Sequence, residues 1–311
     1  MAQLKTDFPE DVRIVYRHFP LASIHDKALL AAQAAEAAGL QDKFWEMHDF
    51  LYETANLWTS YTPNDFQTYL IESATTLGLD TDQFKIDLNS EEIVTFAENT
   101  WQLGQQIGLP GTPFIVINNN PYNGPLDSAS ISDILRLYTF DDEQYAECPP
   151  VVIDPLKAYT ATIETEKGNI VIELFPDFAP LTVNSFVFLA REGWFDGVSF
   201  HRVLPGFIAQ SGDPTGTGMG SPGYAFANEV SDDLNFDRAG LVGMANTGPD
   251  TNGSQFFITY APEEQFNGSY TIFGEVIEGM DVLESLTPRD PSQGGDLPDG
   301  DLIITITITE E

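Results

Sequence analysis

Basic residues, cysteines and long apolar runs are all scarce in this 311-residue chain. It carries 13 Lys and Arg against 48 Asp and Glu, and its formal net charge is −35. A surface this negative repels phosphate backbones and anionic lipid, so nucleic-acid binding is not expected. No run is apolar enough to span a bilayer, so membrane insertion is not expected either. Because 42% of the residues are hydrophobic, the chain can still bury substantial cores.

The single cysteine, Cys148, excludes an intrachain disulfide and a thiolate metal site. The four histidines show no HExxH-type spacing, so they are interpreted as structural residues and not as metal ligands. The first residues, MAQLKTDFPEDVR, are polar and charged, which is not typical of a signal peptide. The compartment stays undefined at this level.

The chain changes character near its middle, and we expect two domains of residues 1–138 and 158–311 with a linker at 139–157. The linker sequence, TFDDEQYAECPPVVIDPLK, contains a Pro-Pro pair and an Asp-Pro step, which predict a moderately stiff connection. The first half alternates helix and strand signals and is interpreted as α/β. The expected helices are 26–38, 43–55, 66–77, 92–107 and 131–138, and the expected strands are 12–16 and 114–117.

The second half has dense glycine, few long helices and alternating apolar residues, which predict an antiparallel closed sheet. Residues 159–164 and 167–175 indicate a hairpin around Glu166-Lys167-Gly168. In the final segment, DLIITITITEE, strict alternation places Ile304, Ile306 and Ile308 on one face and Ile303 on the other.

Two long motifs lie in this half: FHRVLPGFIAQSGD from residue 200 and GMANTGPDTNGSQFFIT from residue 243. Together they resemble the cyclophilin family of peptidyl-prolyl cis-trans isomerases over about residues 158–311. The resemblance implies an all-β, eight-stranded barrel with two capping helices. It also implies rotation of X-Pro bonds in unfolded or flexible polypeptides, without a cofactor.

The resemblance assigns catalysis to Arg202, which would stabilise the twisted amide, and to Gln210, which would hold the guanidinium or the substrate backbone. The implied substrate-binding residues are Phe207, Ile208, Ala245, Asn246, Thr247, Gln255, Phe257, Phe266 and Tyr270. Other interpretations remain open. Phe207 and Phe257 could be core residues, Arg202 could be a surface ion-pair partner, and both halves could bind peptides without catalysis.

Three positions depart from the commonest eukaryotic pattern of this family. Gln265 stands where that pattern has a rim tryptophan, Tyr270 where it has a histidine, and Ile208 where it has a methionine. Loss of the indole removes a hydrogen-bond donor and a large contact area. The resemblance therefore implies weak cyclosporin binding.

Residues 10–137 resemble the disulfide-oxidoreductase branch of the thioredoxin fold, through EDVRIVYRHFPL, the helical insertion after it, and GLPGTPFIVINN at 108–119. The resemblance implies a cis Thr112-Pro113 bond. It also implies that the first strand and the Cys-x-x-Cys pair are missing, so no thiol-disulfide exchange is expected. Either the chain is a truncated form of a longer protein, expected outside the cytoplasm of a bacterium, or this half has rearranged into a binding scaffold.

Overall fold

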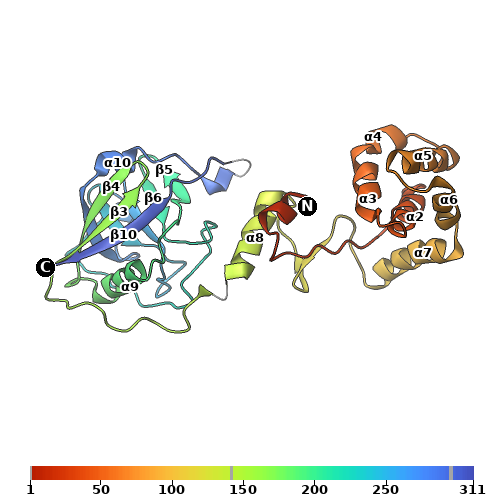
Figure 1. Ribbon diagram of the computed structural model, residues 1–311. Coiled ribbons are helices and arrows are strands. Elements are labelled where there is room, and N and C mark those ends of the chain that lie inside the picture. Colours follow the sequence, from red (N-terminus) through yellow and green to blue (C-terminus); the bar gives the residue numbers. More distant parts are fainter. Residues whose placement is uncertain (1, 141–142, 294–296) are drawn as a thin grey trace. The chain divides into compact units, whose positions relative to one another are not determined.

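The computed structural model describes residues 2–140, 143–293 and 297–311 as two compact units, Ala2–Gly124 and Pro125–Glu311 (Figure 1). Asp141 and Asp142, in the expected linker, lie outside the described residues. In the described parts of the chain, no helix is both long and apolar enough to cross a membrane.

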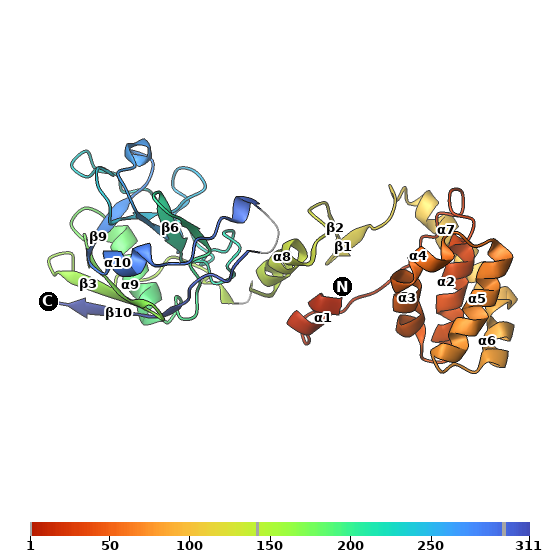
Figure 2. The same cartoon turned by 90° about the horizontal axis from the view of Figure 1, so that it is seen from above.

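The first unit is mostly helical, and its helices between residues 28 and 106 lie together (Figure 2), with an alanine-rich core among them. Small side chains on α2 let α3, α5, α6 and α7 approach it closely, and five of its alanines are buried. Thr62, Asp80 and Ser90 accept hydrogen bonds from the free backbone N–H groups at the starts of α5, α6 and α7. The helices are α1 (Ala2–Asp7), α2 (Ala28–Gly39), α3 (Phe44–Glu53), α4 (Ala55–Trp58), α5 (Pro63–Thr76), α6 (Thr81–Leu88) and α7 (Glu91–Gln106).

The strands of the first unit differ from the prediction. Strand β1 (Ile115–Ile117) forms a two-stranded antiparallel sheet with β2 (Asn120–Tyr122), and the Thr112–Pro113 peptide bond before it is cis. The strand predicted at 12–16 is wrong. Side-chain exposure alternates along residues 12–16, as in an extended chain, but among the described residues no other strand pairs with this segment. A period-two pattern fixes an extended backbone, whereas a strand also needs a neighbour.

The second unit contains a curled, eight-stranded antiparallel sheet, with strand order β10-β3-β4-β9-β7-β8-β6-β5. The hairpin expected around Lys167 joins β3 to β4. A bridge between Ser199 and Leu302 links the segments that precede the two edge strands, β5 and β10. The strands are β3 (Tyr159–Thr165), β4 (Gly168–Leu174), β5 (Arg202–Leu204), β6 (Ile208–Ser211), β7 (Leu241–Met244), β8 (Phe256–Thr259), β9 (Ile272–Glu278) and β10 (Ile303–Glu310).

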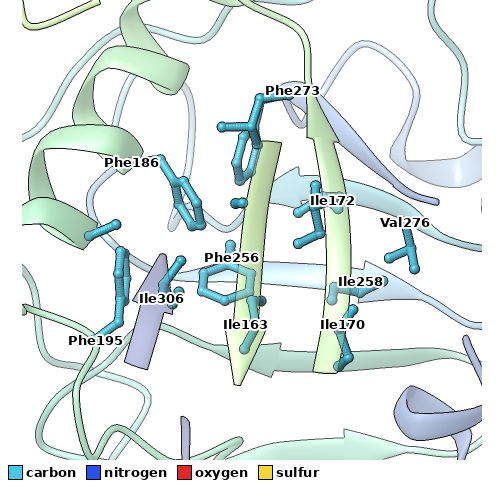
Figure 3. Packing of buried hydrophobic residues seen from close by; sticks show 14 of the residues in the cluster. Ile163, Ile170, Ile172, Phe186, Phe195, Phe256, Ile258, Phe273, Val276 and Ile306 are labelled. Atoms are coloured by element: carbon cyan, nitrogen blue, oxygen red, sulfur yellow. The ribbon is translucent and has the colours of Figure 1, made fainter. Parts of the chain in front are cut away.

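The main core of this unit lies between the sheet and α9 (Pro180–Arg191). Phe186 on α9 packs edge-to-face on Phe256 of β8, with ring centroids 5.5 Å apart, and Phe195 contacts the same ring (Figure 3). Phe256 is fully buried there, as expected for a core residue. The remaining helices are α8 (Ser128–Phe140), α10 (Met280–Glu284) and the 3-10 turns η2 (Glu264–Phe266) and η3 (Pro291–Gln293).

The last strand corrects the predicted alternation of its isoleucines. The pairing of β10 with β3 shifts register between Ile303 and Thr305. This bulge buries Ile303 together with Ile306, while Ile304 is 47% exposed. A bulge inserts one residue and so reverses the face of everything before it, which strict alternation cannot anticipate.

Candidate active site

Four neighbouring strands place a row of chemically distinct residues across one face of the sheet. Arg202 on β5 pairs with Gln210 on β6, Gln210 pairs with Phe257 on β8, and Phe257 pairs with Gly243 on β7. Directly paired residues project to the same side of a sheet. A cation, an amide and an aromatic ring therefore follow each other from the sheet edge inward.

An apolar cluster, separate from the main core, lies beside this row. Phe266 is its centre, because its ring lies 5.6 Å from Phe207, 5.3 Å from Phe257 and 5.0 Å from Tyr270 between centroids. Phe207 and Phe266 are only partly buried, so the cluster opens toward solvent. The cluster comprises Ile208, Phe236, Leu241, Phe257 and Ile272, with Phe175, Phe207, Leu234, Ala245, Phe266 and Tyr270 packed against it.

Glycine at position 243 makes the shape of this cluster possible. A Cβ added to Gly243 would overlap Cζ of Phe257 and lie 2.9 Å from Cζ of Phe236. Those two rings stack with centroids 5.6 Å apart and an interplanar angle of 26°. The sequence prediction did not include Phe236. Its signal is weak, because it is a single aromatic residue in a polar, irregular stretch, LNFDRAG.

Arg202 differs from the other basic residues of residues 158–311. Lys167, Arg191, Arg238 and Arg289 each donate side-chain hydrogen bonds to carboxylates or carbonyls. Within the described residues, the Arg202 guanidinium forms neither an ion pair nor a hydrogen bond. It lies over the Phe207 ring, 5.6 Å from the centroid. Among the described residues, the donors of Arg202 are therefore not used by another side chain.

The amide of Gln210 is held by a second amide. Gln210 Nε2 donates to Gln255 Oε1 at 3.0 Å. Gln255 Nε2 in turn donates to the carbonyl oxygens of Gly218 and Gly220, at 3.0 and 2.9 Å. Because Gln255 uses both ends of its side-chain amide in hydrogen bonds, the orientation of that amide is fixed. The glycine-rich stretch at 216–223 is thus a support for Gln255.

Asp213 organises that glycine-rich loop from inside. Its carboxylate is fully buried and accepts hydrogen bonds from the backbone N–H groups of Thr215, Gly218 and Gly220, at 2.8, 2.6 and 3.0 Å. The hydroxyl of Thr215 donates to it as well. The motif singles out this aspartate, although the prediction gave it no role.

His201, next to Arg202, is 2% exposed, and neither of its ring nitrogens has a hydrogen-bond partner among the described residues. Burial lowers the pKa of its imidazole to about 4, although the nearby Asp213 carboxylate acts in the opposite direction. The ring is therefore neutral near pH 7, and it adds no charge beside the Arg202 guanidinium.

A loop follows β7, and its first residue, Ala245, packs against the cluster. The side chain of Asn246 is committed to this loop, donating to the Ser269 carbonyl at 3.1 Å and accepting from Gly248 N–H at 3.2 Å. Thr247 is bound to Thr251 in the same loop. In the described structure, the main-chain N–H and C=O of Asn246 make no hydrogen bond. These two groups are thus available to an extended peptide.

The predicted substrate residues are therefore brought together around one partly open apolar cluster, with Arg202, Gln210 and Gln255 along its margin. Pro113 belongs to the other unit. No group of three or more His, Cys, Asp or Glu that could hold a metal occurs among the residues described.

Comparison with known proteins identifies the class. The sequence model of the family "Cyclophilin type peptidyl-prolyl cis-trans isomerase/CLD" matches residues 160–308, and the model described as "Thioredoxin" matches residues 2–136. The chain belongs to the cyclophilin-type peptidyl-prolyl cis-trans isomerases, and it carries a thioredoxin-type domain before the isomerase domain.

The curated relatives agree. The chain is 44% identical over 182 residues to peptidyl-prolyl cis-trans isomerase A of Mycobacterium tuberculosis strain H37Rv, covering 53% of this chain and 100% of the relative. It is 46% identical over 141 residues to human peptidyl-prolyl cis-trans isomerase-like 1, covering 44% of this chain and 83% of that relative. A crystal structure of a Cryptosporidium parvum cyclophilin shares 39% identity and covers 49% of this chain and 98% of its own, with a TM-score of 0.46. Because these two curated relatives are 44% and 46% identical to the chain, the protein is a peptidyl-prolyl cis-trans isomerase.

Proposed function

We propose that Arg202 is the catalytic residue and that it acts on X-Pro bonds of flexible or unfolded polypeptides. Rotation about an amide is slow because resonance creates a barrier of about 18–20 kcal/mol. Resonance is lost when the prolyl nitrogen becomes pyramidal in the twisted state. A guanidinium that donates to that nitrogen binds the twisted state more tightly than either planar isomer, which lowers the barrier.

The observation that carries this proposal is that the Arg202 guanidinium, beside a partly open aromatic cluster, has no hydrogen-bond or ion-pair partner in the part of the chain that the structure describes. The proline ring would occupy the space bordered by Phe207, Phe257 and Phe266, and the substrate backbone would pair with the main chain of Asn246. Gln210 would hold the substrate carbonyl or the guanidinium, since its own amide is anchored by Gln255. Ile208, Ala245, Thr247 and Tyr270 would complete the walls.

The test is a protease-coupled assay on a peptide with an Ala-Pro bond. We expect Arg202→Ala to lower kcat/KM by about 100-fold or more, because a donor aimed at a transition state is worth that much in other active sites. Arg202→Lys should recover only part of the loss, since an ammonium lacks the planar fork. Arg238→Ala is the matched control, because Arg238 is paired with Glu275 at 2.6 Å. Equal rates for wild type and Arg202→Ala would remove Arg202 from the mechanism.

We also propose weak cyclosporin binding. Gln265 is exposed on the pocket rim, and its amide donates to Glu263 at 2.7 Å, so it offers the inhibitor neither an indole N–H nor a broad apolar face. Replacing Gln265 by Trp should tighten inhibition by at least tenfold, about 1.4 kcal/mol, without a matching change in kcat/KM. A tight inhibition constant for the wild type, unchanged in Gln265→Trp, would contradict this assignment.

For the domain limits, we propose an isomerase domain at 158–311 and a thioredoxin-like domain at 1–138, with 139–157 between them. The two family matches, 160–308 and 2–136, support these limits. The thioredoxin-like domain would present polypeptides to the isomerase or be a remnant. Removing that domain and measuring the refolding rate of a proline-limited protein separates these roles, because a presenting domain should raise kcat/KM for proteins but not for short peptides.

A further inference from the structure

Residues 143–153, which we call the strap, lie along the surface of the second unit outside the family match. Ile153 of the strap is 7% exposed and belongs to the main core, and Tyr145 and Val152 pack against that core. The strap lies within the segment 139–157 that is proposed to connect the two domains. Its backbone and side chains bind two elements of the second unit, the loop at 221–225 and helix α9.

The strap is bound firmly at its far end to α9. Asn184 accepts from Val152 N–H at 2.7 Å and donates to the Pro150 carbonyl at 2.9 Å. Arg191 donates to the Val152 carbonyl at 3.2 Å. These bonds fix the strap to the rigid body of the barrel.

At its near end the strap holds the glycine-rich loop. Tyr145 N–H donates to the Pro222 carbonyl at 2.9 Å, and Gln144 Nε2 donates to the Ser221 carbonyl at 3.2 Å. The approach is so close that a Cβ added to Gly223 would overlap the Tyr145 carbonyl oxygen. The Tyr145 ring contacts Phe188 on α9, with centroids 5.4 Å apart, so the near end is also packed on the barrel.

The loop held by the strap is the one that orients Gln255. The carbonyl oxygens of Gly218 and Gly220, which lie shortly before Pro222 in the loop, accept hydrogen bonds from the side-chain amide of Gln255. Pro222 also lies over the backbone before Gln255, since a Cβ on Gly253 would be 2.9 Å from its Cδ. A continuous series of contacts thus runs from Gln144 and Tyr145 through the loop to Gln255 and Gln210.

We propose that Gln144 and Tyr145 are positioning residues of the isomerase, which set the wall of the substrate site through loop 218–223 and Gln255. The proposal rests on the roles given above to Gln210 and Gln255. Asp213 shapes the loop from inside, and the strap fixes where the loop lies relative to the barrel. Because the strap does not contact Arg202, it affects substrate binding more than rotation of the bound amide.

The experiment compares kcat and KM of the full chain with Gln144→Ala, Tyr145→Ala and Tyr145→Phe on an Ala-Pro peptide. We expect a rise in KM of about fivefold in each alanine variant, with kcat within about twofold of wild type. Gln144→Ala removes the hydrogen bond to the Ser221 carbonyl, and Tyr145→Ala removes the ring packing that holds the Tyr145 N–H against the Pro222 carbonyl. The Gln255 side-chain amide signals should shift in the NMR spectra of both. Tyr145→Phe keeps the ring packing and should match wild type. Gln144 is exposed, so its variant tests the proposal even if Tyr145→Ala folds poorly.

Arg191→Ala is the control, because it loosens the strap seven residues from Tyr145 and does not touch the loop. It should lower stability and leave KM and the Gln255 signals unchanged. An unchanged KM in Gln144→Ala and Tyr145→Ala, or an equal rise in Arg191→Ala, would overturn the proposal. Arg202→Ala in the same series separates the two proposals. If Arg202→Ala is inactive, an unchanged KM in the strap variants rules out only the role of the strap. If Arg202→Ala is fully active, the assignment of the site itself is wrong.

Discussion

Replacing Gly243 by alanine tests whether the aromatic cluster is shaped by the absence of one side chain. The added methyl would overlap Cζ of Phe257 and approach Cζ of Phe236 at 2.9 Å. Carbon atoms normally pack at about 3.5–4.0 Å, so the Phe257 ring must move by roughly 1 Å. Both rings are buried, whereas Phe207 and Phe266, which border the space proposed for the proline ring, are only partly buried. The Phe257 ring should therefore move into the space proposed for proline.

Two consequences should be measurable. Overpacking of a buried site costs about 1–3 kcal/mol, so Gly243→Ala should lower the free energy of unfolding by an amount in that range. A displaced Phe257 should also lower kcat/KM on the Ala-Pro peptide by about tenfold, which corresponds to about 1.4 kcal/mol of lost binding to the twisted state. Denaturant unfolding and the coupled assay give the two quantities on one protein sample.

Gly274→Ala is the matched control on strand β9. Its Cβ would lie 2.7 Å from the Glu173 carbonyl oxygen and 2.8 Å from Ile172, in the main core rather than beside the site. It should destabilise the fold to a similar degree with kcat/KM unchanged. If Gly243→Ala loses stability but keeps wild-type kcat/KM, the reasoning that places the proline beside Phe257 is refuted.

Two further predictions concern polar side chains of the second unit. His201 has a pKa of about 4 in the fold, below its usual value of about 6.5, so its contribution to stability is complete above pH 6.5 and is lost as the pH falls toward 4. His201→Gln should not show this loss. The difference in the free energy of unfolding between wild type and variant should therefore change by about 2 kcal/mol between pH 7 and pH 4.5. Urea unfolding at both pH values measures it, and a difference that does not change with pH would contradict the prediction. The Glu229 carboxylate accepts from the backbone N–H groups of Leu181 and Thr182 at the start of α9, at 2.9 and 2.8 Å. Glu229→Ala should lower the free energy of unfolding by about 1–2 kcal/mol, and Glu229→Gln should lower it less, as measured by thermal unfolding. If the wild type and both variants are equally stable, this helix cap does not contribute to stability.

The sequence predicted the parts of this protein whose structure depends on local pattern. The helices at 28–39 and 91–106 follow from apolar spacing and end signals, and the two long motifs place Arg202, Phe257 and Asn246 around one cluster. The helix at 81–88 was missed because only two of its residues are buried, which leaves little periodicity.

Features that depend on distant neighbours could not be predicted in the same way. Whether residues 12–16 form a strand depends on a partner segment, and whether Ile303 or Ile304 is buried depends on a bulge opposite β3. The contacts of Gln144 with Ser221 and of Cys148 with Ala225 each span 77 residues. No spacing within a motif indicates such a pair, so a proline-rich stretch with charges was interpreted as a linker.

The strap also bears on the choice of a fragment that carries the isomerase domain alone. A shortened chain starting at Ala158 would satisfy the family match, yet it would uncover the surface where Tyr145 contacts Phe188, Trp194 and Tyr224. It would also leave Asn184 and Arg191 without the strap groups that they bind. Exposed aromatic surface of this kind promotes self-association. A fragment meant to represent the isomerase alone should therefore begin before Gln144. The difference in solubility between such a fragment and one starting at Ala158 measures how much aromatic surface the strap covers.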